Sequence, residues 1–262
     1  GRRVLSAGRS PDLDAIHSLA VRLAEKAADI HRDGLERGVE VGQKSGAGDL
    51  VTESDRAAER AIVDGIEAER PDDAILGEEG TDRPGSSGVR WVIDPLDGTA
   101  SYVRGYPGYA VSIGVEVDGE PALGVVIDAL GRTTEGVAGR GATRDGRGVT
   151  PSAVDTLEHA VLATGFGYEP AKRVAEARVL EAVIGRVADV RRSGSAAMDL
   201  CAVATGEVDA YYELHLAPWD IAAGRVIVEA AGGVFRQLPQ PDGETLTVAP
   251  PGGLLGPLLE LL

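Results

Sequence analysis

Six consecutive residues, Asp94-Pro95-Leu96-Asp97-Gly98-Thr99, place two carboxylates, a glycine and a hydroxyl side by side. Carboxylate oxygens are hard ligands of the kind that Mg²⁺ prefers. If a helix begins at Gly98 and Thr99, its free backbone N–H groups suit a phosphate. Divalent cations beside a phosphate cradle are an arrangement that hydrolyses phosphate esters, so these residues predict that chemistry.

The residues before this motif are expected to hold it at the end of a strand. Residues 89–93 (Val-Arg-Trp-Val-Ile) form a short apolar run, which is typical of a buried strand. The two aspartates would then leave its carboxyl end, where open α/β sheets place ligands. Taken alone, Asp94 and Asp97 are equally compatible with a turn and a helix cap, because Asp-Gly is a common turn signal.

The first half of the chain shows helical and strand patterns in turn. Apolar residues recur at helical spacing from about 11 to 35, small polar residues at 44–49 predict a loop, and Ser54 or Asp55 could cap a second helix. Residues 81–88 are expected to be a mobile surface loop. Residues 111–117 and 123–127 predict a hairpin around the turn signal Asp118-Gly119.

The second half starts near Pro151 and predicts the same kind of alternation. Strands are expected at 161–165, 187–191 and 210–213, and helices at 171–183, 195–206, 221–231 and 254–262. No internal repeat and no low-complexity linker separates the halves. Layers of helices and sheets are therefore expected.

Composition sets the broad class. With 262 residues, 43% hydrophobic and 26% charged, the chain can form one large domain or two closely packed halves. The formal net charge of −16 argues against binding to nucleic acid or to an anionic membrane surface. Cys201 is the only cysteine, which fits a reducing, cytoplasmic environment, and no Cys/His set has zinc spacing. We find no transmembrane run and interpret residues 1–6 as lacking a signal peptide.

Five segments, in their order and spacing, resemble the inositol monophosphatase family of Mg²⁺-dependent, lithium-sensitive phosphomonoesterases. They are Lys44 with 49–55 (Asp-Leu-Val-Thr-Glu-Ser-Asp), 77–79 (Gly-Glu-Glu), 91–99, 192–197 (Arg-Ser-Gly-Ser-Ala-Ala) and 219–224 (Trp-Asp-Ile-Ala-Ala-Gly). One such motif would be weak, whereas five in order, from about residue 10 to the C-terminus, are specific.

The resemblance implies an α+β fold, a layered αβαβα sandwich of the inositol monophosphatase and fructose-1,6-bisphosphatase type, as one domain over 1–262. The half up to about 150 would carry most metal ligands. The half from about 151 would carry the substrate wall and Asp220.

The resemblance also implies a ligand set for two Mg²⁺ ions. Glu78, Asp94 and the backbone carbonyl of Leu96 would hold the first, and Asp94, Asp97 and Asp220 the second. Alone, Glu78 would be solvated charge and Asp220 a helix N-cap. Together with the Asp94 motif, the functional interpretation is favoured.

Catalytic roles follow from the same resemblance. Glu78 and Thr99 would orient and deprotonate the attacking water, and the Gly98 and Thr99 N–H groups would hold the phosphate. Asp55 is expected to support Thr99, and a weak third Mg²⁺ at Asp55 stays an alternative. The hydroxyl of Thr99 can relay a proton to a carboxylate.

The substrate wall is implied to consist of Gly194, Ser195, Ala196 and Glu213, with Lys44 on a loop over the site. Lys44 could equally be a surface lysine. A carboxylate at Glu213 disfavours a second phosphate on the substrate, because two anions would meet. A neutral polyol or a cationic group is therefore favoured, unless Arg191 or Arg192 turns inward.

Our first hypothesis is hydrolysis of a small phosphorylated polyol or similar monoester, with inositol 1-phosphate the best guess. Histidinol-phosphate, sugar phosphates and nucleotide 3′-phosphates are alternative substrates within the family. A regulatory binding protein that retains the fold is the alternative of another class. A homodimer is implied by resemblance. Departures from the family pattern at Ser101 and Tyr102, and one extra alanine within 229–233, touch no metal ligand.

Overall fold

The computed structural model describes residues 11–39, 41–46, 49–241 and 243–262, and for residues 43–50 no side chain is described. Residues 1–6, which we interpret as lacking a signal peptide, lie outside the described residues. Within the described ranges, no helix has the length and apolar character needed to cross a membrane.

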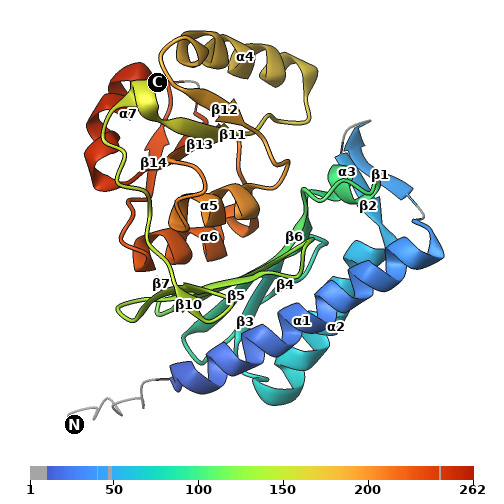
Figure 1. Cartoon of the computed structure of the whole chain (residues 1–262). Helices are drawn as coiled ribbons and strands as arrows, with labels where there is room; N and C mark the ends of the chain where they lie inside the picture. Colours follow the sequence, from blue (N-terminus) through green and yellow to red (C-terminus); the bar gives the residue numbers. More distant parts are fainter. Residues whose placement is uncertain (1–10, 40, 47–48, 242) are drawn as a thin grey trace.

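Helices and sheets alternate in five layers (Figure 1). The outer helices are α1 (Leu13–Arg37) and α2 (Glu53–Glu69), the central pair is α5 (Ala196–Ala204) and α6 (Pro218–Ala230), and the far layer holds α4 (Pro170–Ile184) and α7 (Leu255–Leu261). A sheet separates each helical layer from the next. The predicted αβαβα sandwich is therefore confirmed.

The larger sheet has eight strands in the order β10-β9-β8-β7-β6-β5-β3-β4. Their bounds are β3 (Ala74–Gly77), β4 (Asp82–Arg83), β5 (Val89–Asp97), β6 (Ala110–Val117), β7 (Glu120–Asp128), β8 (Thr133–Val137), β9 (Gly141–Arg144) and β10 (Arg147–Gly148). β3 and β5 pair in parallel, and every other neighbouring pair is antiparallel. The predicted hairpin is β6–β7, with Asp118 (φ 52°) and Gly119 (φ 83°) in its turn.

The smaller sheet has five strands in the order β12-β11-β13-β15-β14. Their bounds are β11 (Val161–Thr164), β12 (Asp189–Arg191), β13 (Ala210–Leu214), β14 (Arg236–Pro239) and β15 (Thr245–Ala249). Successive side chains of a strand face opposite sides of the sheet. Tyr211 accordingly packs with α5 and α6, and Tyr212 packs with α4 and α7. The sheet thus has apolar residues on both faces, and short 3₁₀ turns lie at Leu157–His159 and Gly252–Leu254.

A pair of helices covers the outer face of the larger sheet. The apolar face of α1, including Ile16, Leu19 and Leu23, is buried with α2 and with strands β5 to β7. Burying each of these side chains contributes about 1.5–3 kcal/mol. Because α2 is fixed in this way, its buried carboxylates Asp55 and Glu59 have defined positions beside the sheet.

Three glycines form the seat for α6 on the other face of this sheet. Gly114, Gly124 and Gly136 lie opposite one another on β6, β7 and β8. A Cβ at Gly124 would lie 2.3 Å from the carbonyl oxygen of Ala223. The backbone of α6 therefore lies closer to β7 than a side chain at position 124 would permit. The approach positions the N-terminus of α6, which carries Asp220, against the first half of the chain.

Three local expectations were wrong or incomplete. Of the predicted loop 44–49, residues 44–46 belong to β1 (Val41–Gly46) and residue 49 to its antiparallel partner β2 (Asp49–Thr52), because a paired register supplies backbone hydrogen bonds even to small polar residues. Residues 47–48 lie outside the described residues. Helix α2 is capped by Thr52, one turn before Asp55. Asp55 instead accepts the Thr52 N–H at 2.8 Å, which completes a capping box. The 81–88 segment includes the short strand β4.

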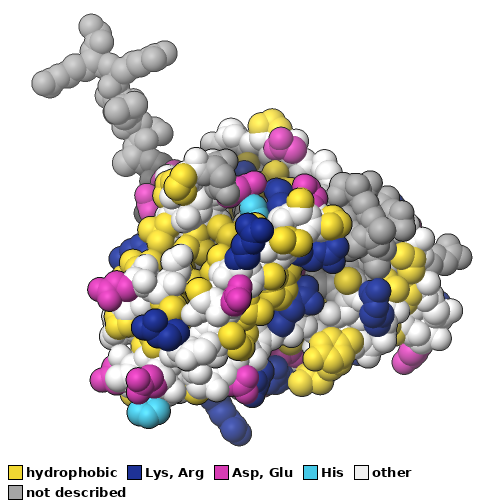
Figure 2. Space-filling model, turned by 90° about the horizontal axis from the view of Figure 1, so that it is seen from above, with side chains coloured by type: hydrophobic (Ala, Val, Ile, Leu, Met, Phe, Trp, Pro, Cys, Tyr) yellow, Lys and Arg dark blue, Asp and Glu magenta, His cyan; other side chains and the backbone are white. Residues whose placement is uncertain are grey.

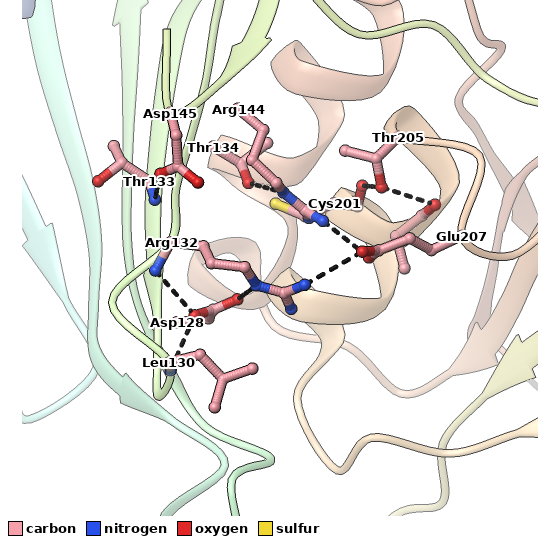
Figure 3. A network of polar contacts seen from close by, with 11 residues as sticks. Asp128, Leu130, Arg132, Thr133, Thr134, Arg144, Asp145, Cys201, Thr205 and Glu207 are labelled. Carbon is pink, nitrogen blue, oxygen red and sulfur yellow. Dashed lines mark hydrogen bonds and ion pairs between the residues drawn. The ribbon is translucent and has the colours of Figure 1, made fainter. Parts of the chain in front are cut away.

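A polar network links the turn after β7 to the loop after α5 (Figure 3). Arg132 donates to Asp128 at 2.7 Å and to Glu207 at 3.1 Å, and Arg144 pairs with Glu207 at 2.8 Å. Burial works against the charge of Glu207, but the two arginines hold its pKa below the usual value. The network therefore stabilises the contact between the two halves.

The acidic side chains are divided between the surface and the interior. On the face shown in Figure 2, Asp and Glu lie with Lys and Arg among apolar side chains. Several carboxylates are buried instead of exposed, among them Asp55, Glu59, Asp94 and Asp199. Part of the acidic side chains that make the formal net charge negative therefore lies inside the protein.

Candidate active site

A cavity of about 370 Å³ is lined by residues of both halves. The first half contributes Glu78, Asp94 and the residues from Leu96 to Thr99, and the second contributes Gly194, Ser195, Ala196, Glu213 and Asp220. These are residues that the sequence predicted as ligands or substrate contacts. Segments more than 100 residues apart in the chain thus meet at one place.

A bulge in β5 turns both aspartates toward the cavity. The register against β6 runs from Asp94–Ser112 to Asp97–Ala110, so β5 has one extra residue there. In a regular strand, residues three apart face opposite sides, and the extra residue cancels this difference. Pro95 has no N–H to pair and fits the interrupted ladder. The strand therefore continues through the motif, whereas the sequence predicted that it ends before Asp94.

Internal hydrogen bonds fix Asp94 and Thr99. The Leu96 N–H donates to Asp94 Oδ1 at 3.0 Å. Thr99 Oγ1 lies 2.9 Å from Asp55 Oδ1 and 3.1 Å from the Leu96 carbonyl oxygen. Asp55 is fully buried. Its hydrogen bond with Thr99 is the contact that the sequence predicted. Gly98 (φ 92°) precedes the short helix α3 (Thr99–Tyr102), where the sequence predicted a helix start.

Donors at the N-termini of α5 and α6, both in the second half, hold Asp97 and Asp220. Asp97 Oδ2 accepts hydrogen bonds from Ser195 Oγ and from the Ala197 N–H, both at 2.7 Å. Asp220 Oδ2 accepts the Ala217 N–H at 2.6 Å. The N-cap of α6 is Ala217, so Asp220 supports the helix from its third position, whereas the sequence alone suggests that Asp220 is the cap itself.

Burial and the charges of neighbouring carboxylates raise the pKa values of Asp94, Asp97 and Asp220. Burial, followed by the charges of Glu78, Asp97 and Asp220, raises the pKa of Asp94 well above its usual value. Burial likewise raises the pKa of Asp97 to about 7, although Ser195 and Ala197 oppose the shift. The pKa of Asp220 is raised by burial and by the charge of Asp97. A cation among these groups would relieve both the repulsion and the cost of burial.

The donor set fits a hard divalent cation, although the side chains do not enclose one as they stand. No group of three His, Cys, Asp or Glu residues in the described part of the chain has the geometry of a metal site. One oxygen each of Asp94, Asp97 and Asp220 accepts a backbone N–H. Their second oxygens, with Glu78, give an all-oxygen set suited to Mg²⁺.

Glu213 also lines the cavity. Its carboxylate accepts a hydrogen bond from Tyr211 Oη at 2.6 Å. Burial raises the pKa of Glu213 to about 8, and Tyr211 opposes the shift. A Cβ at Gly165 would lie 2.0 Å from the carboxylate, so the chain leaves space for this acid.

Arg192, which the sequence offered as an arginine that could turn inward, lines the cavity and lies over the Phe166 ring at 5.8 Å. Lys172, Asp199 and His215 also line the cavity and were not predicted. At His215 the one unusual backbone feature is a positive φ of 64°, which the sequence does not show. No motif marks these residues, because they meet only in the folded chain. The side chain of Lys44 lies outside the described residues.

The fold and the acid-lined cavity define a layered α+β enzyme, and comparisons identify the class. The family model described as "Inositol monophosphatase family" matches residues 12–259. An inositol-1-monophosphatase of Mycobacterium leprae is 43% identical over 87% of this chain and 83% of its own length. A protein of Escherichia coli named Nus factor SuhB is 40% identical, over 83% of both chains.

Solved structures agree with this result. The extragenic suppressor protein suhB of Bartonella henselae superposes with a TM-score of 0.87 at 32% identity, over 94% of this chain and 98% of that one. The chain belongs to the inositol monophosphatase family. The protein is accordingly a phosphomonoesterase by class.

Proposed function

We propose that the protein hydrolyses a small phosphomonoester in a Mg²⁺-dependent reaction, with inositol 1-phosphate as the best candidate substrate. The observation that carries the proposal is the convergence of Glu78, Asp94, Asp97 and Asp220 on one cavity from three separate segments. A structural role gives no reason to bring four mutually repelling carboxylates together in one cavity.

Two Mg²⁺ ions would be held by this set, with Asp94 shared between them. Glu78 and the Leu96 carbonyl would complete one site, and Asp97 and Asp220 the other. When bound, the cations would neutralise the phosphate, activate a water and stabilise the leaving oxygen. A third, weaker Mg²⁺ site near Asp55 would be seen as a third equivalent in a binding titration.

The chain's own groups would position the reactants. Thr99 Oγ1 donates a hydrogen bond to Asp55 Oδ1, so the hydroxyl can take a proton from water as its own proton passes to the Asp55 carboxylate. Glu78 would share the task of orienting and deprotonating that water. The Gly98 and Thr99 N–H groups would donate to the phosphate.

The cavity residues Glu213, Gly194 and Ala196 favour a hydroxyl-rich leaving group. With its pKa raised to about 8, Glu213 is mostly protonated at neutral pH and can both donate a hydrogen bond to a hydroxyl and accept one. The small residues Gly194 and Ala196 line the same cavity. Arg192 also lines the wall, so preference for a monoester over a bisphosphate is a real test of the assignment. Ser195 is already hydrogen-bonded to Asp97, and Lys44 would act from the hairpin if it faces the cavity.

The proposal is tested by measuring phosphate release from a panel of esters with and without Mg²⁺. The panel contains inositol 1-phosphate, histidinol phosphate, fructose 1,6-bisphosphate, adenosine 3′,5′-bisphosphate and glycerol 2-phosphate. Turnover of inositol 1-phosphate that a chelator abolishes supports the proposal. Preference for a bisphosphate would overturn the Glu213 argument, and unaffected turnover in Asp97→Asn would overturn the second metal site.

A second candidate function is regulatory binding, because relatives at 40% identity are named Nus factors. That role would use the outer surface and would survive Asp94→Asn. Pull-down from native lysate with wild type and Asp94→Asn checks it. A stoichiometric partner retained by both proteins would support this function beside the enzymatic one, and no retained partner would count against it.

Three further properties are proposed from the family resemblance. Lithium is expected to inhibit hydrolysis at millimolar concentration. A homodimer is expected, which sedimentation would refute if only monomer were found. A cytoplasmic location is supported by the single, buried and unpaired Cys201.

A further inference from the structure

Glu59 is a buried carboxylate that has no place in the catalytic set described above. It lies on α2, one helical turn after Asp55, and is 5% exposed. Its Oε2 accepts the Glu79 N–H at 2.8 Å. Its Oε1 accepts the Thr81 N–H at 3.2 Å and a hydrogen bond from Thr81 Oγ1 at 2.7 Å. One carboxylate therefore satisfies three donors of a single turn.

That turn, residues 77–81, carries Glu78. The Gly77 N–H donates to the Thr81 carbonyl at 2.7 Å, and the Glu78 N–H donates to the Ile93 carbonyl at 3.1 Å. Gly80 has a φ of 115°, which a side chain would disfavour. The turn is thus closed on itself, tied to β5 through Glu78, and held from α2 through Glu59.

Gly77 shows how closely Glu59 fits the turn. A Cβ at Gly77 would lie 2.5–2.9 Å from the three atoms of the Glu59 carboxylate group. Real Cβ contacts of this length do not occur, so a glycine is required while Glu59 keeps its position. The sequence motif Gly77-Glu78-Glu79 therefore contains a steric requirement as well as a proposed ligand.

We propose that Glu59 is a positioning residue for Glu78. By fixing the turn at Glu79 and Thr81, Glu59 sets the direction in which Glu78 enters the cavity. This inference rests on the proposed function, in which Glu78 binds Mg²⁺ and orients water.

Asp55 and Glu59 lie four residues apart on α2. Residues four apart lie on the same face of a helix. Asp55 contacts Thr99 from that face, and Glu59 holds the turn of Glu78. One helix face therefore sets the separation between Thr99 and Glu78, the two groups proposed to act on the same water.

The test compares Glu59→Gln and Glu59→Ala with wild type and with a control, Ile66→Ala. Ile66 is fully buried on α2 and belongs to the apolar core, so this variant loses stability without touching the turn. For each protein we would measure Mg²⁺ binding by calorimetry, the Mg²⁺-dependent rise in Tm, and kcat and KM.

Loss of groups that orient metal ligands typically costs 10–100-fold in metal affinity or activity. We expect Glu59→Ala to weaken Mg²⁺ binding and lower kcat within about this range, with little change in KM. Glu59→Gln keeps one acceptor oxygen and is expected to fall between Glu59→Ala and wild type. Ile66→Ala is expected to lower Tm while Mg²⁺ binding stays at the wild-type value.

Gly77→Ala tests the contact between Gly77 and Glu59 independently. Alone, it is expected to weaken Mg²⁺ binding, because the methyl group collides with Glu59. In the Glu59→Ala background that collision is removed, so the same substitution is expected to cost less. If Glu59→Ala does not fold, Thr81→Val removes only the Oγ1 hydrogen bond and is expected to give a smaller change in the same direction.

Two outcomes are distinguishable. Wild-type Mg²⁺ binding and kcat in both Glu59 variants would overturn the positioning role, while the enzymatic proposal would stand. Absence of Mg²⁺-dependent turnover in folded wild-type protein would overturn the proposed function itself.

Discussion

Ser195 Oγ donates a 2.7 Å hydrogen bond to Asp97 Oδ2, and the same oxygen of Ser195 accepts the Met198 N–H at 3.2 Å. Ser195 therefore caps α5 and orients an aspartate of the other half of the chain. The Ala197 N–H donates to Asp97 at 2.7 Å as well. One of the contacts between the two halves is thus made at the site itself.

Ser195→Ala is expected to lower the free energy of unfolding by about 1–2 kcal/mol, because the cap of α5 and a buried hydrogen bond are both lost. Mg²⁺ affinity is expected to fall as well, since Asp97 loses one of its two hydrogen bonds. Denaturant unfolding and a Mg²⁺ titration measure the two effects. Ser195→Asp keeps a cap but repels Asp97, so a Mg²⁺ affinity equal to that of wild type would contradict this account.

Thr99→Val is expected to lower kcat by roughly 10²–10⁴, the usual contribution of proton transfer by a positioned group. KM is expected to change little, because the backbone N–H groups remain. Asp55→Asn is expected to have a similar effect, and the double variant to cost little more, since both act through one hydroxyl. Additive losses would show that Asp55 acts separately from Thr99.

Mg²⁺ binding is expected to release protons near neutral pH. Asp97 has a pKa of about 7 without the cation, and the pKa values of Asp94 and Asp220 are raised too. Mg²⁺ needs the ionised forms, so its affinity should fall as the pH drops below about 7. Calorimetry in buffers of different ionisation enthalpy gives the number of protons released. No release at pH 7 would contradict the raised pKa values.

Glu213 gives a pH dependence of stability that can be separated from metal binding. Burial raises its folded pKa to about 8 from the usual 4.5, with Tyr211 opposing. Between these values the folded state holds a proton that the unfolded state loses, so its contribution to stability falls as the pH rises through this window.

Glu213→Gln is therefore expected to flatten the fall in stability between pH 4.5 and pH 8. At pH 8 the variant is expected to be more stable than wild type by about 4 kcal/mol, since each unit of the pKa shift is worth about 1.4 kcal/mol. Tyr211→Phe removes the opposing hydrogen bond and is expected to extend the window upward. Thermal unfolding as a function of pH measures both, and parallel curves for wild type and Glu213→Gln would refute the prediction.

Gly124→Ala is expected to destabilise the protein by about 1–3 kcal/mol, because its methyl group would overlap the backbone of α6. Mg²⁺ affinity is expected to fall too, as α6 carries Asp220. Gly148→Ala is the control, since a Cβ there meets nothing within 4 Å. Equal unfolding free energies for the two variants would show that α6 is not seated on the glycines.

Local sequence determined much of this protein. The helical spacing of Ile16, Leu19 and Leu23 predicts α1, and the Asp118-Gly119 signal predicts the β6–β7 turn. The family pattern in the sequence also points to Glu78, Asp94, Asp97 and Asp220, because short motifs at strand and helix ends carry their own signal. These features depend on neighbours in the chain, which a sequence shows directly.

Tertiary structure alone decided the rest. The bulge that turns Asp94 and Asp97 to one side depends on β6, and the seat of α6 depends on glycines from three different strands. Lys172, Asp199 and His215 meet at the cavity from separate elements. Glu59 reaches Glu79 across 20 residues of chain. Contacts of this kind arise from packing between distant segments, and no local spacing records them.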